Sequence, residues 1–253
     1  MNKRVLVTGS TKGIGRAVVE KFHDKGWDVG VTARDEANIR ELTDQFNQKR
    51  QNSAIGIKAD LSLKDEVKFL KQRLEQEWQK VDCIVFNVGS GSGTKGLMST
   101  SSENELSLKT NYLDVVRTFK NLLPLVKKEM GSTLIFIGSI AQEINVKAPI
   151  SYSYAKRALN NFAMAQALEL APERILVNLI NPGHILTRGG TWEKKMEQSK
   201  TEFEEFISKN IPVGRIGQVQ DVADLVFAYS NQELSNYSTG VRINLDGGTS
   251  INL

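Results

Sequence analysis

Short runs of apolar residues alternate along this chain with longer segments in which apolar residues recur every three or four positions. The runs predict buried strands, and the segments predict helices with one apolar face. Because strands and helices alternate and the strand runs are apolar throughout, the pattern predicts an α/β chain with seven parallel strands between two layers of helices. The predicted strands span residues 4–8, 28–33, 54–58, 83–86, 134–137, 175–180 and 240–245.

The composition bounds the number of domains and the class of partner. Of the 253 residues, 40% are hydrophobic and 25% are charged, which suffices for one large core. We find no repeat, low-complexity tract or linker, so residues 1–253 are predicted to form a single domain. The net charge of +4 is dispersed along the chain, so no nucleic-acid partner is expected.

The cysteine and histidine content predicts whether disulfides or metal sites are present, and the start of the chain indicates the cellular location. Cys83 is the single cysteine and lies in an apolar run, so we expect a buried thiol without a disulfide. With two histidines and no clustered cysteines, no metal site is expected. The first apolar run is too short for a signal peptide or a membrane span, so a cytoplasmic protein without a membrane partner is expected.

A glycine-rich turn follows the first predicted strand. Residues 9–15 read Gly-Ser-Thr-Lys-Gly-Ile-Gly, and a helical apolar pattern follows them. Glycines allow a tight turn and close approach to a pyrophosphate, and the N-terminus of the helix offers free N–H groups to phosphates. The turn therefore predicts a dinucleotide site in a Rossmann-like, doubly wound, three-layer α/β/α fold. The same glycines also suit a strand-to-helix turn that binds nothing.

The end of the second predicted strand indicates which dinucleotide binds. An acidic residue there would bind the ribose 2′-hydroxyl of NAD and repel the 2′-phosphate of NADP, but this chain has Ala33 followed by Arg34. Lys12 in the glycine turn adds a second cation, so the two side chains predict a clamp for the 2′-phosphate of NADP(H). Two alternatives stay open: Asp35 pairs with Arg34 and weakens the clamp, or both cations are ordinary solvated charges.

Polar or glycine positions stand at the ends of four predicted strands. These are Gly9, Arg34, Asp60 and Asn87. In a parallel sheet of this kind, ligands bind at the carboxyl ends of the strands. The four residues are therefore expected to border one site.

A tyrosine and a lysine begin a predicted helix that ends near Pro172. Tyr152 and Lys156 are four residues apart, so they share one face of this helix. An ammonium beside a phenol favours the phenolate, and an acid whose pKa is lowered toward neutrality suits carbonyl reduction or alcohol oxidation. Taken alone, the pair also fits a partly exposed helix face without a function.

The segment 189–210 combines many charges with interspersed apolar side chains, including Trp192, Phe203 and Phe206. Two interpretations stand equally. In the first, residues 184–210 form an amphipathic insertion that acts as a lid over the substrate. In the second, the segment is an ordinary surface helix.

The order and spacing of these motifs, from Thr8 to Gly248, resemble those of the short-chain dehydrogenases/reductases, and among them the 3-oxoacyl-carrier-protein-reductase-like members. Asn87-Val88-Gly89 stands where the family has Asn-Ala-Gly, and Val88 is a departure that could narrow the cofactor wall. Asp246-Gly247-Gly248 resembles the C-terminal signature. The cofactor contacts implied by this resemblance are Gly9, Ser10, Thr11, Lys12, Gly13, Ile14, Gly15, Arg34, Asp60, Leu61, Asn87, Val88, Gly89, Tyr152, Lys156, Pro182, Gly183, Ile185 and Thr187.

The same resemblance implies a catalytic tetrad of Asn111, Ser139, Tyr152 and Lys156. The implied reaction is hydride transfer between the nicotinamide of NADP(H) and a small-molecule carbonyl or secondary alcohol, with Tyr152 as general acid/base and Ser139 binding the carbonyl oxygen. Lys156 would lower the pKa of Tyr152 and hold the nicotinamide ribose, and Asn111 would hold a water in a proton relay. A homo-oligomer, either tetramer or dimer, is also implied.

Three functions remain open at this stage. The first is an NADPH-dependent carbonyl reductase. The second is an NADP-dependent dehydrogenase or reductase of a sugar or nucleotide-sugar, for which the loop 90–93 and the charged segment 189–210 would be suitable. The third is a catalytically silent nucleotide-binding sensor, which the presence of Tyr152, Lys156 and Ser139 disfavours.

Overall fold

Seven parallel strands form the centre of the molecule. The computed structural model describes residues 2–91, 99–128, 131–143, 148–231 and 236–251. The strand order is β3-β2-β1-β4-β5-β6-β9, which confirms the predicted seven-stranded parallel sheet. The strands are β1 (Arg4–Thr8), β2 (Asp28–Ala33), β3 (Ala54–Lys58), β4 (Cys83–Phe86), β5 (Ser132–Ile137), β6 (Ile175–Pro182) and β9 (Arg242–Leu245).

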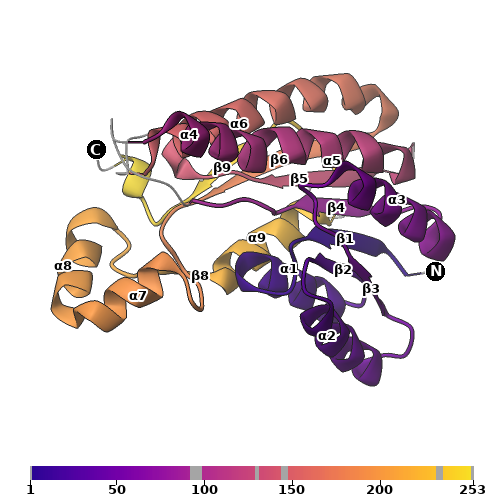
Figure 1. The fold of residues 1–253 in the computed structure, drawn as a ribbon, viewed down its shortest axis with the longest axis horizontal. Helices are drawn as coiled ribbons and strands as arrows, with labels where there is room; N and C mark the ends of the chain where they lie inside the picture. The colour runs from indigo at the N-terminus through magenta and orange to yellow at the C-terminus, as the bar shows by residue number, and fades with distance from the viewer. Residues whose placement is uncertain (1, 92–98, 129–130, 144–147, 232–235, 252–253) are drawn as a thin grey trace.

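Helices cover both faces of the sheet (Figure 1). One layer consists of α3 (Lys64–Trp78), α4 (Ser101–Leu108), α5 (Asp114–Leu122) and α6 (Ile150–Leu170). The other consists of α1 (Gly13–Asp24), α2 (Glu36–Lys49) and α9 (Val219–Ser230). Successive side chains of β1 point to opposite faces of the sheet. Leu6 packs against the first layer of helices, and Val5 and Val7 pack against the second. This alternation explains why the strand runs are apolar at every position.

The chain reverses direction across the sheet between β1 and β4. It runs outward from β1 to β2 and β3, then returns to β4 on the other side of β1. A crevice opens at such a point, beyond the carboxyl ends of the strands. Asn87 bridges its two sides, because its Nδ2 donates to Thr8 O at 3.0 Å and to Gly9 O at 3.1 Å. The fold therefore places the glycine turn beside the end of β4.

The sequence of residues 106–128 predicts one helix, and the structure differs from this prediction. Helix α4 begins earlier, where Thr100 and Glu103 form a capping box, and α5 ends at Leu122 before a short 3-10 turn that contains Pro124. Between α4 and α5 lies a π-helical turn (Lys109–Leu113). Such wide turns occur frequently at functional sites, and apolar spacing alone does not reveal them.

Two helices and a short ladder follow β6. The pair β7 (Ile185–Leu186) and β8 (Gly217–Gln218) is parallel, and the sequence did not predict it because two residues show no periodicity. Helices α7 (Thr191–Gln198) and α8 (Lys200–Asn210) meet at Ser199, so the segment 189–210 is a pair of helices instead of one. No helix within the described ranges is long and apolar enough to cross a membrane.

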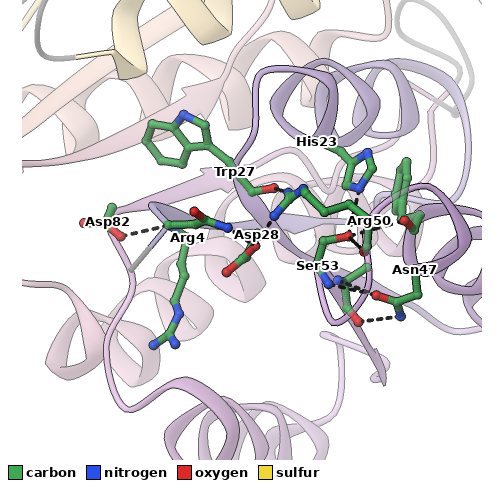
Figure 2. A network of polar contacts seen from close by, with 11 residues as sticks. Arg4, His23, Trp27, Asp28, Asn47, Arg50, Ser53 and Asp82 are labelled. Carbon is green, nitrogen blue, oxygen red and sulfur yellow. Dashed lines mark hydrogen bonds and ion pairs between the residues drawn. The ribbon is translucent and has the colours of Figure 1, made fainter.

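Figure 2 shows a polar network near the amino ends of the strands, at the end of the sheet opposite to the crevice. The backbone N–H of Arg4 donates to Asp82 Oδ2 at 2.8 Å, and the Arg4 guanidinium donates to Trp78 O at 2.6 Å. The Arg50 guanidinium contacts Asp28 Oδ1 at 2.6 Å. The Arg4 bonds join β1 to the residue before β4 and to the end of α3, and the Arg50 bond joins the end of α2 to the start of β2.

His23 is buried within this network. Its Nε2 lies 2.9 Å from Ser53 Oγ, and its ring stacks on Phe46 with the centroids 4.5 Å apart. Burial lowers the pKa of His23 below its ordinary value, and the charge of Arg50 acts in the same direction, while Asp24 opposes it. The folded protein therefore favours the neutral imidazole.

We expect the free energy of unfolding to fall as the pH drops below 6.5, the ordinary pKa of histidine. The unfolded chain takes up a proton there more readily than the folded chain, so the contribution of His23 is complete above this pH and lost below it. His23→Gln removes this titration. Denaturant unfolding from about pH 7.5 to about pH 5 should show a shallower loss in the variant than in the unmodified protein. Because His184 is present in both proteins, the difference between the two pH dependences reports His23. Equal pH dependences would contradict the assignment of this loss of stability to His23.

Candidate active site

A cavity of about 1170 Å³ lies beyond the carboxyl ends of β1 to β6. All four predicted catalytic residues border it: Asn111, Ser139, Tyr152 and Lys156. The predicted cofactor residues that border it are Gly9, Thr11, Lys12, Ile14, Arg34, Asp60, Leu61, Asn87, Val88, Gly89, Tyr152, Lys156, Pro182, Gly183, Ile185 and Thr187. The fold thus gathers residues from six strand ends into one site.

Three predicted cofactor residues lie outside the cavity wall and shape the glycine turn. The hydroxyl of Ser10 accepts from Thr32 N at 3.0 Å, which ties the turn to β2. Gly13 has a φ of +55°, in the region that favours glycine. A Cβ at Gly15 would lie 2.4 Å from Gly9 O, so only glycine allows α1 to approach β1 so closely.

The glycine turn is suited to a pyrophosphate. Helix α1 begins immediately after Lys12, and neither a side-chain cap nor an acidic residue occupies its first turn, so its N–H groups can bind an anion. Gly9 has a φ of +64°, and a Cβ there would lie 3.0 Å from Val88 Cγ2. Val88, the departure from the family pattern, therefore closes tightly against the turn.

Tyr152, Ser139 and Lys156 meet where α6 passes the end of β5. The Ser139 and Tyr152 side chains are hydrogen-bonded to each other. Lys156 is buried, its Nζ donates to Ile137 O at 2.9 Å, and the same nitrogen lies 5.8 Å from the centroid of the Tyr152 ring. One helix face and one strand end thus bring an acid, a hydroxyl and an amine together.

The expected lowering of the tyrosine pKa is not observed. Burial raises the pKa of Tyr152 above its ordinary value, and the hydrogen bond with Ser139 offsets this only in part. Burial also lowers the pKa of Lys156 to about 8. Helical spacing correctly predicts that the two side chains lie on one face, but it does not measure how deeply they are buried. Burial disfavours the charged form of each group, and this effect changes both pKa values.

Comparison with known proteins assigns the family. Residues 9–250 match the family model described as Enoyl-(Acyl carrier protein) reductase. A tropinone reductase homologue of Arabidopsis thaliana is 31% identical over 99% of this chain and 92% of its own. The chain is a short-chain dehydrogenase/reductase. A 3-oxoacyl-[acyl-carrier-protein] reductase of Buchnera aphidicola is 28% identical over 96% of this chain and 95% of its own, which supports the predicted resemblance.

Solved structures of short-chain dehydrogenases/reductases share this fold over nearly their whole length. One from Caenorhabditis elegans, of unknown function and solved with cofactor, matches with a TM-score of 0.90 and 26% identity, covering 100% of this chain and 96% of that chain. The RhlG/NADP active-site complex of Pseudomonas aeruginosa matches with a TM-score of 0.88 and 27% identity, covering 98% and 96%.

In this short-chain dehydrogenase/reductase, Lys12 and Arg34 border the cavity on the side of β2. Asp35 does not pair with Arg34, because its Oδ1 accepts from Asn38 N at 3.1 Å and caps α2. Among the described residues, no ion pair involves Lys12 or Arg34. Both cations are therefore available to an anionic ligand.

Asp60 lies on the loop after β3 and is held in its charged form. Burial acts to raise the pKa of Asp60, but hydrogen bonds from Ser62 and the charges of Arg34 and Lys109 outweigh burial, so the pKa lies below its ordinary value. The carboxylate is therefore available as a hydrogen-bond acceptor at the edge of the cavity.

Asn111 occupies the π-helical turn, fully buried. Its Oδ1 accepts from Ser90 N at 2.9 Å, and its Nδ2 donates to Ser90 O at 2.9 Å and to Ser107 O at 3.0 Å. A Cβ at Gly89 would lie 2.8 Å from Asn111 Oδ1 and 3.1 Å from Lys156 Nζ, so any larger residue there would displace one of these two side chains. The side chain of Asn111 thus orders the loop after β4 in this dehydrogenase/reductase.

An aromatic cluster fastens α7 and α8 to the end of β6. The ring of Trp192 lies 4.7 Å from that of His184 and 4.6 Å from that of Phe206, and Lys195 Nζ lies over the Trp192 ring at 4.4 Å. Trp192 also borders the cavity. The segment 184–210 therefore contributes to the wall of the site, and its proposed motion as a lid stays a prediction.

Sequence reasoning missed one wall of the cavity. These residues lie on the same helical stretch as Asn111, and they are Glu103, Leu106, Ser107, Thr110 and Asp114. Helical spacing relative to Asn111 was the available signal for Ser107 and Asp114, because positions three and four residues away share its face. The predicted polar loop 90–93 is described only as far as Gly91, so Ser92 and Gly93 lie outside the described residues.

Proposed function

We propose that this protein is an NADPH-dependent carbonyl reductase. The observation that supports it best is the hydrogen-bonded Tyr152–Ser139 pair beside buried Lys156, in the same cavity as a glycine turn and the two cations Lys12 and Arg34. These groups supply a proton donor, an oxygen-binding hydroxyl and a phosphate site. NADPH, when bound, would supply the hydride.

Three polar side chains act in the proposed reduction. Tyr152 donates its phenolic proton to the carbonyl oxygen as that oxygen gains negative charge. Ser139 donates a hydrogen bond to the same oxygen and stabilises the developing alkoxide. Lys156 holds the nicotinamide ribose and keeps a positive charge near Tyr152. Burial raises the pKa of Tyr152 above its ordinary value, so the phenol carries the proton that the reduction requires.

The proposed cofactor is NADP(H) because of charge. Arg34 and Lys12 border the cavity without an ion pair among the described residues, and no carboxylate stands at Ala33. The structurally similar RhlG was solved with NADP. A guanidinium fork and an ammonium suit a phosphate group, while a bare ribose would leave both cations unpaired.

The walls of the cavity bear on the class of substrate. Trp192 and Leu106 contribute apolar surface, which favours a carbonyl compound with an apolar part. The sugar or nucleotide-sugar alternative remains open because the substrate is not defined by these walls alone. We further propose a homo-oligomer, since large apolar side chains are exposed on α4, α6 and the turn between α4 and α5, namely Leu106, Leu113, Tyr154 and Leu168.

A substrate screen tests the proposed function. NADPH absorbance is followed with acyl thioesters, small ketones and keto sugars, and we expect consumption with at least one carbonyl class. Consumption with sugars alone would favour the polar alternative. If NADPH binds but no class of substrate leads to its consumption, the result would favour a nucleotide-binding sensor. If NADPH does not bind, the result would contradict both the reductase and the sensor.

A further inference from the structure

Three charged residues form a cluster at the junction of the π-helical turn and α5. Lys109 Nζ contacts the two carboxylate oxygens of Asp114 at 2.8 and 3.0 Å, and Arg117 Nη2 donates to Asp114 Oδ1 at 2.7 Å. Asp114 is 4% exposed, and its side chain is the most buried carboxylate in any ion pair of the described ranges. The cluster has a single anion between two cations.

Both cations also bind the loop that follows β3. Arg117 Nη2 donates to Leu61 O at 2.6 Å, and Lys109 Nζ donates to Ser62 O at 3.3 Å. These carbonyls adjoin Asp60, whose backbone N–H donates to Glu66 Oε2. The cluster therefore fixes the loop from the side of α5, and Glu66 fixes it from the side of α3.

The same stretch of helix also reaches the catalytic side of the cavity. Asn111 lies between Lys109 and Asp114 in sequence, and it binds both backbone groups of Ser90 on the loop after β4. One turn of chain thus bonds to the loop after β3 and to the loop after β4. Asp114 itself borders the cavity between them.

We propose that Asp114, through Lys109 and Arg117, is a positioning residue that holds the Asp60–Ser62 loop in the conformation that binds the adenine half of the cofactor. Asp114 orients the two cations, and the cations orient the two carbonyls. This inference rests on the proposed function, because it assigns a role in cofactor binding to residues that no chemical step requires.

Asp114→Asn separates positioning from simple electrostatics. The substitution keeps the shape of the side chain and removes a negative charge near a site for an anionic ligand. If only the electric field mattered, phosphates would bind more tightly in the variant. If Asp114 positions the loop, the two cations repel each other, Lys109 turns toward solvent and the loop loses an anchor, so binding weakens. The two mechanisms predict opposite signs.

The experiment measures calorimetric affinities for NADPH and for adenosine 2′,5′-bisphosphate, which represents the adenine half alone. We expect Asp114→Asn to weaken both by about three- to tenfold, as for the loss of about one ordinary hydrogen bond between neutral groups. KM for NADPH should rise by a similar factor while kcat at saturating NADPH stays within about twofold, because the reacting groups are unchanged.

Asp82→Asn is the matched control. Asp82 also accepts from a lysine, with Lys127 Nζ at 2.6 Å from its Oδ1, but it lies at the amino ends of the strands. It should lower stability without changing either affinity. Arg117→Lys is the second variant: it conserves charge and cannot bind Leu61 O and Asp114 together with the same fork, so it should weaken the adenine-half ligand about two- to fivefold.

The outcomes are distinct. Equal or tighter binding of adenosine 2′,5′-bisphosphate by Asp114→Asn overturns the positioning role while leaving the proposed function intact. If Asp114→Asn does not fold, unchanged affinity in Arg117→Lys overturns it instead. An unmodified protein that binds neither NADPH nor the half-ligand overturns the proposed function together with this inference.

Discussion

Replacing Tyr152 with phenylalanine is expected to lower the turnover of carbonyl reduction by about a hundredfold to ten-thousandfold. The ring stays in place, but the phenolic proton that would reach the carbonyl oxygen is lost, and so is the bond with Ser139. Because the phosphate and ribose contacts proposed for the other residues are unchanged, NADPH affinity should stay within a few-fold. The expected loss is therefore confined to kcat.

Tyr154 provides the control for this substitution. It lies on the same helix two residues away, yet it is 66% exposed and does not border the cavity. Tyr154→Phe should turn over at the unmodified rate. Stopped-flow measurement of NADPH oxidation, with calorimetric NADPH binding for each variant, gives both quantities. A Tyr152→Phe protein with near-normal turnover would show that another group donates the proton.

A second large effect is expected in cofactor choice. We expect the unmodified protein to prefer NADPH over NADH by about tenfold or more, because each charge-assisted hydrogen bond to the 2′-phosphate contributes about 1.5–3 kcal/mol. Arg34→Ala and Lys12→Ala should each reduce the preference, and the double variant should nearly abolish it. NADH affinity should change little, because NADH has no phosphate at that position.

Arg40→Ala tests whether any nearby cation would have the same effect. Arg40 lies on α2, and its side chain is 75% exposed. Its Nη2 lies 3.8 Å from Glu36 Oε1. Its removal should leave the ratio of the two dissociation constants unchanged. Added salt should weaken NADPH binding more than NADH binding if the clamp is exposed to solvent. Equal affinity for both cofactors in the unmodified protein would identify Arg34 and Lys12 as ordinary surface charges.

The sequence was sufficient to predict the sheet and most of the cavity wall. Runs such as 83–86 are apolar at every position because helices cover both faces of the sheet, and that pattern is local. The glycine turn and the Tyr152–Lys156 pair depend on short spacings along the chain. The carboxyl ends of parallel strands meet at one edge, so motifs far apart in sequence could be assigned to one site.

Features that depend on burial or on distant contacts could not be predicted in this way. The direction of the Tyr152 pKa shift depends on how much protein surrounds the phenol, which helical spacing does not measure. The contact of Arg117 with Leu61 joins residues that are 56 positions apart in the sequence. The π-helical turn at Asn111 has helical segments on both sides, so the spacing of apolar residues does not reveal it.

The polar network at the amino ends of the strands has a consequence for protein engineering. Arg4, Asp28, Arg50 and Asp82 form hydrogen bonds at the amino ends of the strands (Figure 2). The residues that border the cavity lie beyond the carboxyl ends. Substitutions at distant, independent sites usually have additive effects. Directed evolution can therefore raise thermal tolerance with a mutant library restricted to the amino edge, and a second library at the carboxyl edge can then alter substrate range on the stabilised scaffold.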